Sequence, residues 1–391
     1  MNAPTRMNEV TPQVITFHLD GKPIEAFEGE SILKAAERSG VCIPHLCYKD
    51  GLRADGNCRA CVVEIKGERT LAPSCCRTAT AGMEVQATSE RAVKSQKMVL
   101  EMLLSDMPDT GYKWNETDES QQHGELSDWA ARMEVHVRPE LKALRREQPK
   151  ADISHPAMAV NLDACIQCNR CVRACREEQV NDVIGYAMRG SHSEIVFDLN
   201  DPMGDSTCVA CGECVQACPT GALMPKTQVG SQIVDKKVDS VCPFCGVGCL
   251  LTYNVKDNVI VSVDGRDGPA NHSRLCVKGR YGFDYVRHGE RLTAPLIRRD
   301  GVAKNAADIE RVKRGEVVLS ALFREASWDE ALDFAANGLR ELRDAAPAGA
   351  PSALAGFGSA KGSNEEAYLF QKLVRQGFRS NNVDHCTRLC H

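Results

Sequence analysis

Two closely matched groups of cysteines lie in the middle of this 391-residue chain. Both have the spacing Cys-x2-Cys-x2-Cys-x3-Cys, and they comprise Cys165, Cys168, Cys171 and Cys175, then Cys208, Cys211, Cys214 and Cys218. Three thiolates from one such loop can each bind one iron of a cubic cluster, while the fourth thiolate reaches a second cluster. We therefore assign one [4Fe–4S] cluster to Cys165, Cys168, Cys171 and Cys218, and another to Cys208, Cys211, Cys214 and Cys175.

The two groups form the only evident internal repeat, and together they resemble a bacterial two-cluster ferredoxin. The second half keeps the usual proline after its last cysteine, Pro219, whereas Arg176 stands there in the first half. Disulfides and zinc are the alternative explanations for so many cysteines. Disulfides fit poorly because the chain is long and its cysteines bunch in Cys-x2-Cys frames. Zinc fits poorly because zinc sites seldom use four such closely spaced cysteines twice over.

A further cysteine group near the N-terminus has a different spacing. Its members are Cys47, Cys58, Cys61 and Cys75, and small residues precede Cys58. Small residues let backbone N–H groups approach sulfur, which helps to set a reduction potential. The loop resembles the [2Fe–2S] domain at the start of the complex I large subunit, of iron-only hydrogenases and of NAD-linked formate dehydrogenases. This resemblance implies one [2Fe–2S] cluster here, with Cys76 as the alternative to Cys75. For Cys42 we expect the role of a small buried hydrophobe.

A third kind of group follows the central repeat. Cys242, Cys245, Cys249 and Cys276 fit one further [4Fe–4S] cluster, and a structural zinc site is the alternative. Strand-like residues 250–255 and 259–263 are joined by a short turn, so a hairpin would carry Cys276 back towards the loop. Cys276 is followed directly by Val277, Lys278 and Gly279.

The elements that must position these cysteines can be read from the flanking sequence. Residues 14–28 alternate as two strands around the turn at Asp20 and Gly21, and Ser31 can cap a helix that stops at Gly40. A helix over residues 89–107 and a basic helix near residues 141–147 follow, in a polar connector where His123 has no neighbouring cysteine. We interpret His123 as a surface histidine, because a lone histidine seldom binds metal.

The last hundred residues read as the start of an α/β domain. Ser327 and Glu330 predict a capping box at the start of a helix that runs to about Leu342. Residues 353–357 read as a strand, and a Gly-rich turn over residues 358–364 leads into a helix ending near Gly377. Such a turn can bind anions at the helix N-terminus, although the signal is weak alone.

Composition and charge exclude several classes. A net charge of −5 gives no sign of nucleic-acid binding. No window approaches the ~18 apolar residues of a membrane span, and residues 1–14 lack the apolar core of a secretory signal. We therefore expect a cytoplasmic protein with neither nucleic acid nor membrane as a partner.

The motif around Cys242, Cys276 and Lys278 resembles the opening of the molybdenum or tungsten bis-pterin oxidoreductases. In that family the lysine matching Lys278 lies between the cluster and a pterin. The ending Cys390-His391 looks like the formate dehydrogenase motif, in which a cysteine ligates the metal and a histidine follows. Cys386 is interpreted as structural, and an ordinary thiol is the alternative for Cys390. Taken with the N-terminal cysteines, the chain resembles the N-terminal part of the α subunit of a cytoplasmic NAD-dependent formate dehydrogenase.

This resemblance implies an α+β multidomain fold. Its parts are a β-grasp [2Fe–2S] domain at 12–88, a helical and polar connector at 89–155, a two-cluster ferredoxin domain at 156–230, a [4Fe–4S] domain at 235–295, and the beginning of a pterin-binding catalytic domain at 296–391. The same resemblance implies that family members continue for several hundred residues past His391, so we expect a truncated chain that is incomplete for catalysis.

The resemblance also implies an activity and its partners. Formate would be oxidised to CO2 at molybdenum or tungsten held by two pterin guanine dinucleotides, with Cys390 and His391 as the catalytic pair. Electrons would pass through three [4Fe–4S] clusters and one [2Fe–2S] cluster to a β subunit that carries FMN and reduces NAD. A non-catalytic multi-cluster electron-transfer subunit is one alternative. A relative of the complex I large subunit or of iron hydrogenases is another. The cluster that these bind with one histidine and three cysteines cannot form in the same way here, because no cysteine occurs between Cys76 and Cys165.

Overall fold

The computed structural model describes residues 13–108, 124–142, 150–230, 234–347, 350 and 352–386. The chain forms two compact units that alternate along the sequence between residues 239 and 280. The first comprises residues 1–238, 252–265 and 274–280, and the second comprises residues 239–251, 266–273 and 281–391. Several small sheets and short helices make up both units, which confirms the α+β multidomain class.

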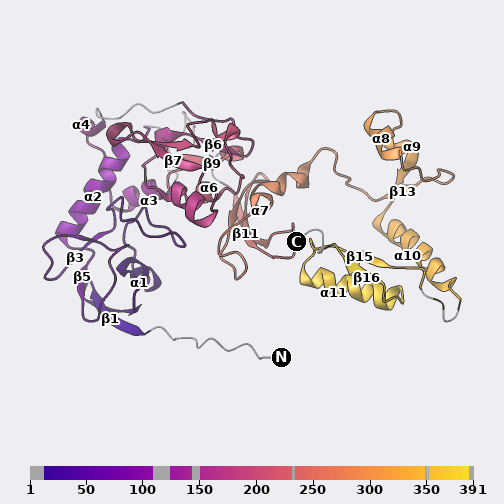
Figure 1. Cartoon of the computed structure of the whole chain (residues 1–391), viewed down its shortest axis with the longest axis horizontal. Helices are drawn as coiled ribbons and strands as arrows, with labels where there is room; N and C mark the ends of the chain where they lie inside the picture. The colour runs from indigo at the N-terminus through magenta and orange to yellow at the C-terminus, as the bar shows by residue number, and fades with distance from the viewer. Residues whose placement is uncertain are drawn as a thin grey trace. The chain divides into compact units, whose positions relative to one another are not determined.

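A five-stranded mixed sheet with one helix opens the first unit (Figure 1). The elements are β1 (Val14–Leu19), β2 (Lys22–Phe27), α1 (Ile32–Arg38), β3 (Val62–Ile65), β4 (Ala72–Pro73) and β5 (Glu84–Gln86). The strand order is β2-β1-β5-β3-β4, with β1 antiparallel to β2 and parallel to β5. The Ser31 side chain accepts a hydrogen bond from the Lys34 N–H and caps α1. This is the β-grasp arrangement that the sequence predicted.

One long helix joins this sheet to the central cysteine repeat. Helix α2 (Glu90–Ser105) buries Leu100, which packs in one cluster with Leu46 and with Leu126 of α3 (Glu125–Arg132). The side chain of Gln96, also buried, donates to the carbonyls of Val62 and Ala87. Helix α4 (Pro139–Lys142) starts the predicted basic helix, and the remainder of that helix and His123 lie outside the described residues.

Short elements carry both halves of the repeat. They are β6 (Met158–Val160), α5 (Arg170–Arg173), β7 (Ile184–Ala187), β8 (Glu194–Phe197), α6 (Glu213–Ala217) and β9 (Leu223–Pro225), with a π-helical turn η2 (Ala174–Glu178) directly after α5. Strands β6 and β9 pair antiparallel, so the chain enters and leaves this domain side by side. Strands β7 and β8 form a hairpin between the two cysteine loops.

A three-stranded sheet follows, in the order β10-β11-β12. Its strands are β10 (Lys236–Val241), β11 (Leu250–Lys256) and β12 (Val259–Gly265), and α7 (Val277–Tyr281) comes after them. The predicted hairpin is confirmed: Asp257 and Asn258 form its turn with φ of 48° and 59°, a conformation that Asp and Asn tolerate.

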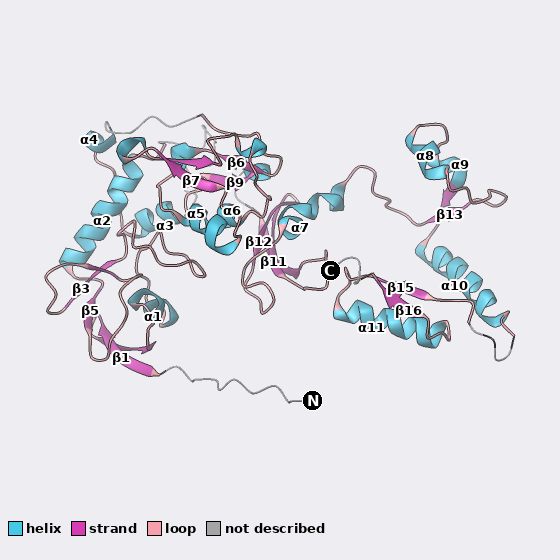
Figure 2. Cartoon of the chain, in the orientation of Figure 1, coloured by secondary structure: helices cyan, strands magenta, loops and turns pink. Residues whose placement is uncertain are grey.

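The second unit contains a pair of antiparallel strands with two short helices between them in the sequence, and a strand-helix-strand segment (Figure 2). Its elements are β13 (Leu296–Arg298), α8 (Asp308–Lys313), α9 (Leu319–Leu322), β14 (Phe323–Glu325), α10 (Trp328–Asp344), β15 (Gly356–Gly358), α11 (Asn364–Lys372) and β16 (Val383–His385). Strands β13 and β14 are antiparallel, whereas β15 and β16 are parallel. A π-helical turn at Leu373–Gly377 continues α11 to the predicted end.

Two details of this unit differ from the sequence prediction. The strand expected at 353–357 is β15 at Gly356–Gly358, because only these residues pair with β16. Ser327 caps α10 as predicted, but the Glu330 carboxylate pairs with Arg324 at 2.6 Å. A complete capping box occurs instead at Ser363 and Glu366, at the start of α11.

Candidate functional site

The same backbone device recurs in three cysteine loops. In each loop, one residue between the first Cys-x2-Cys cysteines has a positive φ: Arg59 at 62°, Gln167 at 53° and Ala210 at 55°. In each loop this conformation turns a backbone N–H towards the preceding thiol. The N–H groups of Ala60, Gln167 and Ala210 lie 3.4 to 3.5 Å from the sulfurs of Cys58, Cys165 and Cys208. Such N–H···S contacts are the ones that tune iron–sulfur clusters.

The structure brings Cys47, Cys58, Cys61 and Cys75 together beside the β-grasp sheet. A hydrogen bond with Cys58 lowers the pKa of Cys47 to about 2, and one with Cys75 lowers the pKa of Cys61 to about 7. The partners carry the opposite shift, so the pKa values of Cys58 and Cys75 are raised. Contacts of Cys47 with Cys58 and Cys75, and of Cys75 with Cys61, therefore bring the four sulfurs close enough to share one small cluster.

The geometry also separates Cys75 from its neighbour. Cys75 is buried and its thiol contacts those of Cys47 and Cys61, whereas Cys76 is exposed with its sulfur 3.6 Å from that of Cys75. The expectation for Cys42 is wrong: this thiol is exposed, because the adjacent Ile43 takes the core position.

The first [4Fe–4S] set surrounds one cavity in the central domain. Cys165, Cys168, Cys171 and Cys218 all line it, together with apolar side chains that include Leu162, Ile195 and Leu223. Burial raises the pKa of Cys168 to about 12 and that of Cys171 well above its usual value. Thiols in such a place become ligands by exchanging the proton for a metal.

The second set is held by α6 and the π-helical turn η2. Cys208, Cys211 and Cys175 all interact electrostatically with Cys214, whose pKa burial raises well above its usual value. Gly212, at the position equivalent to Asn169 in the first half, has φ of 74° against 67° for Asn169. The two halves of the repeat thus fold alike, which supports the exchange of their fourth cysteines.

The third set is divided between the two units. Cys242, Cys245 and Cys249 belong to the second, where the N–H of Cys242 donates to the carbonyl of Cys249 at 2.8 Å. Cys276 belongs to the first unit and directly precedes α7. Lys278 is an exposed residue of that helix. The assignment of these four cysteines to one cluster stays a prediction.

A large cavity lies at the carboxyl ends of the parallel strands β15 and β16. It measures about 990 Å³ and is bounded by the Gly-rich loop 358–364, the first turn of α11, and Val383 to His385. Gly246 and Val247 of the cysteine loop also line it, and the Gly246 N–H donates to the Ala360 carbonyl at 2.8 Å. The carboxyl ends of parallel strands are where α/β proteins bind cofactors. Cys386 follows β16, and Cys390 and His391 lie outside the described residues.

Sequence reasoning missed three buried arginines among these loops. Arg170, Arg173 and Arg280 are only 1 to 2% exposed, and each donates to a backbone carbonyl in another cysteine loop. The available signal in the sequence was their position, because Arg170 and Arg173 lie on either side of Cys171. In the structure, all four residues of this short helix are buried. An arginine there must find buried acceptors.

These residues fit the implied groups. The sulfurs gather in the assigned sets in the first unit, backbone N–H groups face them, and the first set encloses a cavity. Across the residues that the structure describes, no three His, Cys, Asp or Glu side chains form a site for a single metal ion. Within the described helices, none is long and apolar enough to span a bilayer.

Four family models match the chain in succession. Residues 12–90 match a 2Fe-2S iron-sulfur cluster binding domain, and residues 164–222 match a 4Fe-4S dicluster domain. Residues 235–288 match the molybdopterin oxidoreductase Fe4S4 domain, and residues 291–391 match the molybdopterin oxidoreductase domain. The chain thus contains, in this order, segments similar to a 2Fe-2S domain, a 4Fe-4S dicluster domain and the molybdopterin oxidoreductase domains.

The relatives make this class more specific. A protein of Staphylococcus haemolyticus named "Putative formate dehydrogenase" is 29% identical over 415 residues, which cover 95% of this chain and 39% of that protein. Proteins of Staphylococcus aureus with the same name are 28% identical over the same shares. The chain thus spans about two fifths of the length of these curated relatives. Its resemblance to formate dehydrogenases, first seen in the cysteine and Lys-Gly motifs, is confirmed at the level of sequence and domain order.

The chain also matches solved structures. Among them is a crystal structure of an NAD+-reducing [NiFe]-hydrogenase in the H2-reduced state, with 27% identity and a TM-score of 0.48. The match covers 57% of this chain and 92% of that chain.

Proposed function

We propose that this chain is the electron-relaying part of a formate dehydrogenase. It would bind one [2Fe–2S] and three [4Fe–4S] clusters and begin the site for molybdenum or tungsten bis(pterin guanine dinucleotide). The observation that carries the proposal is the cavity at β15 and β16, because the loop of Cys242, Cys245 and Cys249 borders it directly. A cluster held there would adjoin the cofactor cavity, as an electron relay requires.

The reaction is HCOO⁻ → CO2 + H⁺ + 2e⁻. When bound, the metal–pterin group supplies a two-electron acceptor and the clusters supply one-electron sites. Cys390 would hold the metal through its thiolate, since soft thiolates suit such sites. His391 would orient formate or hold the released proton, because histidine changes charge near neutral pH. Lys278 would lie between the third cysteine set and a pterin.

The domains, with the boundaries 12–88, 89–155, 156–230, 235–295 and 296–391, would then pass electrons in the reverse of their order in the sequence. The electrons would leave through the β-grasp domain to a β subunit that carries FMN and reduces NAD. Cytoplasmic location follows from the use of NAD.

Metal analysis and turnover of the full-length complex test this proposal. We expect about 14 irons per chain, from one two-iron and three four-iron clusters, with about one molybdenum or tungsten and formate-dependent NAD reduction. Cys390→Ala should abolish turnover while the iron content stays unchanged. Cys42→Ala is the matched control, because Cys42 is an exposed thiol outside every proposed set.

The alternatives predict different results. Full iron content without molybdenum or tungsten would favour an electron-transfer subunit without catalysis. Zinc in place of iron would contradict both readings.

A further inference from the structure

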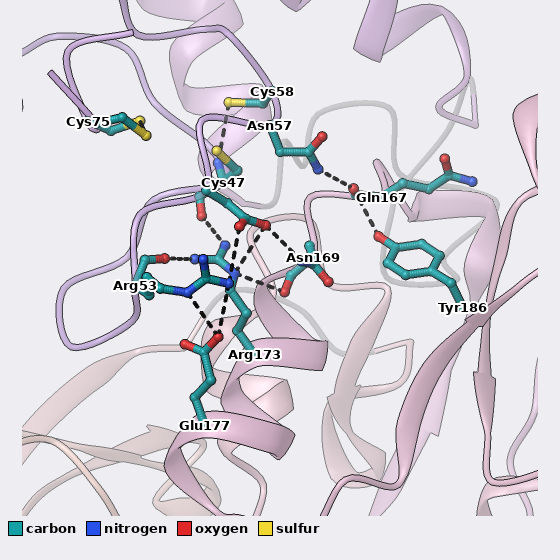
Figure 3. Close-up of polar contacts among 12 residues, drawn as sticks. Cys47, Arg53, Asn57, Cys58, Cys75, Gln167, Asn169, Arg173, Glu177 and Tyr186 are labelled. Carbon is teal, nitrogen blue, oxygen red and sulfur yellow. Dashed lines mark hydrogen bonds and ion pairs between the residues drawn. The ribbon is translucent and has the colours of Figure 1, made fainter.

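Two buried arginines of the first [4Fe–4S] loop reach into the [2Fe–2S] loop. Arg170 is 1% exposed and donates to the Leu46 carbonyl at 2.9 Å, and Arg173 is 2% exposed and donates to the Cys47 carbonyl. Arg173 also donates to the Arg53 carbonyl (Figure 3). One guanidinium therefore fixes both ends of the turn that presents Cys47.

Further contacts lock the same two loops. Asn57, next to Cys58, donates to the Gln167 carbonyl at 2.9 Å, and Gln167 precedes Cys168. Asn169 donates to the Asp55 carboxylate at 2.7 Å. The two cysteine loops are thus in direct hydrogen-bonding contact, with the Arg173 side chain buried among them.

The two arginine charges are balanced differently. The Glu125 carboxylate binds Arg170 at 2.5 and 2.8 Å in a bidentate pair, which neutralises its charge locally. Arg173 donates to three backbone carbonyls and forms an ion pair with Asp55, at 3.7 Å. That carboxylate is shared, since it also pairs with Arg53 and accepts from Asn169.

The consequence is a buried, incompletely balanced positive charge beside Cys47. A charge in such a place acts over several ångströms, because the surrounding dielectric is low. Reduction adds one negative charge to a cluster, so a nearby cation stabilises the reduced form. Hydrogen bonding and local charge are recognised levers on cluster potentials.

We propose that Arg173 is a positioning residue that fixes the Cys47 loop on the first [4Fe–4S] loop and raises the reduction potential of the [2Fe–2S] group. This inference rests on the proposed assignment of that group to Cys47, Cys58, Cys61 and Cys75, and it does not depend on formate being the substrate. It places the first [4Fe–4S] loop in direct contact with the [2Fe–2S] loop.

The test is an EPR-monitored redox titration of the full-length protein with dithionite and mediators, which needs no formate. Arg173→Gln keeps hydrogen-bond donors but removes the charge, so the one-electron equilibrium of the [2Fe–2S] signal should shift about tenfold towards the oxidised form. For a one-electron couple this is a midpoint about 59 mV lower. Arg173→Lys keeps the charge and should stay within about threefold of the wild type, since charge is the cause.

Two matched variants complete the design. Arg176→Gln removes a cation three residues further on, which is exposed and paired with Asp182, and it should leave the [2Fe–2S] midpoint unchanged. Asp55→Asn removes the shared carboxylate and should raise the midpoint, a shift opposite in sign to that of Arg173→Gln. This opposite shift keeps the test decisive even where Arg173→Gln fails to fold.

An unchanged midpoint in Arg173→Gln, an equal fall in Arg176→Gln, or a fall in Asp55→Asn would overturn the inference. The absence of any [2Fe–2S] signal in the wild-type protein would overturn it too. The midpoint shift and formate turnover are independent results. A midpoint shift without formate activity would support the role of Arg173 and would reject only the proposed substrate.

Discussion

At the scale of single residues, the choice between two adjacent cysteines can be tested directly. Cys75 is 2% exposed and its thiol contacts those of Cys47 and Cys61, whereas Cys76 is exposed. We predict that Cys75→Ala loses the [2Fe–2S] signal and about two irons per chain. The measurement is iron content together with the EPR spectrum of the reduced protein.

Cys76→Ala is the matched control, since it removes the neighbouring thiol from the same turn. It should keep the full iron content and the signal. If instead Cys76→Ala loses the cluster and Cys75→Ala retains it, the ligand assignment in this loop must be exchanged.

A buried histidine gives a pH dependence of stability. Burial, together with the nearby Lys226, lowers the pKa of His155, whose Nδ1 accepts hydrogen bonds from the N–H groups of Ala157 and Met158. The neutral ring is therefore the native form. As pH falls below the unfolded value of about 6.5, the unfolded chain binds a proton first and the native state loses stability.

We predict that acidification from pH 7.5 to 5.5 destabilises the wild type more than His155→Asn, in which an amide oxygen can replace the Nδ1 acceptor. The difference should reach at most about 1.4 kcal/mol for each unit of pKa shift. Urea unfolding followed by circular dichroism at both pH values measures it. His18→Asn, at an exposed position, should show the wild-type dependence; equal slopes for all three proteins would refute the role of His155.

The residue scale also shows what the sequence could and could not predict. Spacing alone predicted the sets of Cys165 and Cys208, because a tight loop dictates which thiols face inward. It did not predict Arg173 or Arg280, because their acceptors are carbonyls of Cys47 and Cys211, more than 60 residues away. Local patterns carry no information about such long-range partners.

At the scale of elements, helix α2 joins the β-grasp sheet to the central domain. Leu100 is fully buried in the cluster that includes Leu46 and Leu126, whereas Met102 on the same helix is 62% exposed. We predict that Leu100→Ala lowers the free energy of unfolding by about 2–5 kcal/mol, through lost burial and the cavity left behind. Urea unfolding followed by circular dichroism measures this loss.

Met102→Ala should change the free energy of unfolding by less than about 0.5 kcal/mol, as surface substitutions usually do. Similar losses in both variants would mean that α2 is stabilised by its helical propensity rather than by the packing of its Leu100 face.

Elements with strong local signals were predicted well. The turn at Asp20 and the caps Ser31 and Ser327 appear where the sequence placed them, since each depends on a few neighbouring residues. The boundary of β15 and its parallel pairing with β16 were not predicted, because 26 residues lie between Phe357 and its partner Asp384 in β16, and only tertiary structure fixes the register. The complete capping box at Ser363 was not predicted either, because the sequence there was interpreted as a Gly-rich turn.

At the scale of the whole molecule, buried ion pairs connect cysteine loops that are distant in sequence. Arg280 is 2% exposed, donates to the Cys211 carbonyl at 2.8 Å, and pairs with Glu213 at 2.7 Å. This repeats the contact of Arg173 with Cys47, except that here a buried carboxylate balances the charge. The segment around Cys276 is thereby attached to the second [4Fe–4S] loop in the first unit.

We predict that Glu213→Gln destabilises the protein by about 3–5 kcal/mol, because it leaves the buried Arg280 charge without its partner. The double variant Glu213→Gln with Arg280→Gln should recover part of this loss, since no charge is then buried alone. Urea unfolding followed by circular dichroism measures both.

Glu178→Gln is the matched control: its pair with Arg274 is about one quarter exposed, so solvent screens the loss and the effect should stay below about 1 kcal/mol. A double variant less stable than Glu213→Gln alone would show that Arg280 acts through its bond to Cys211 rather than through its charge.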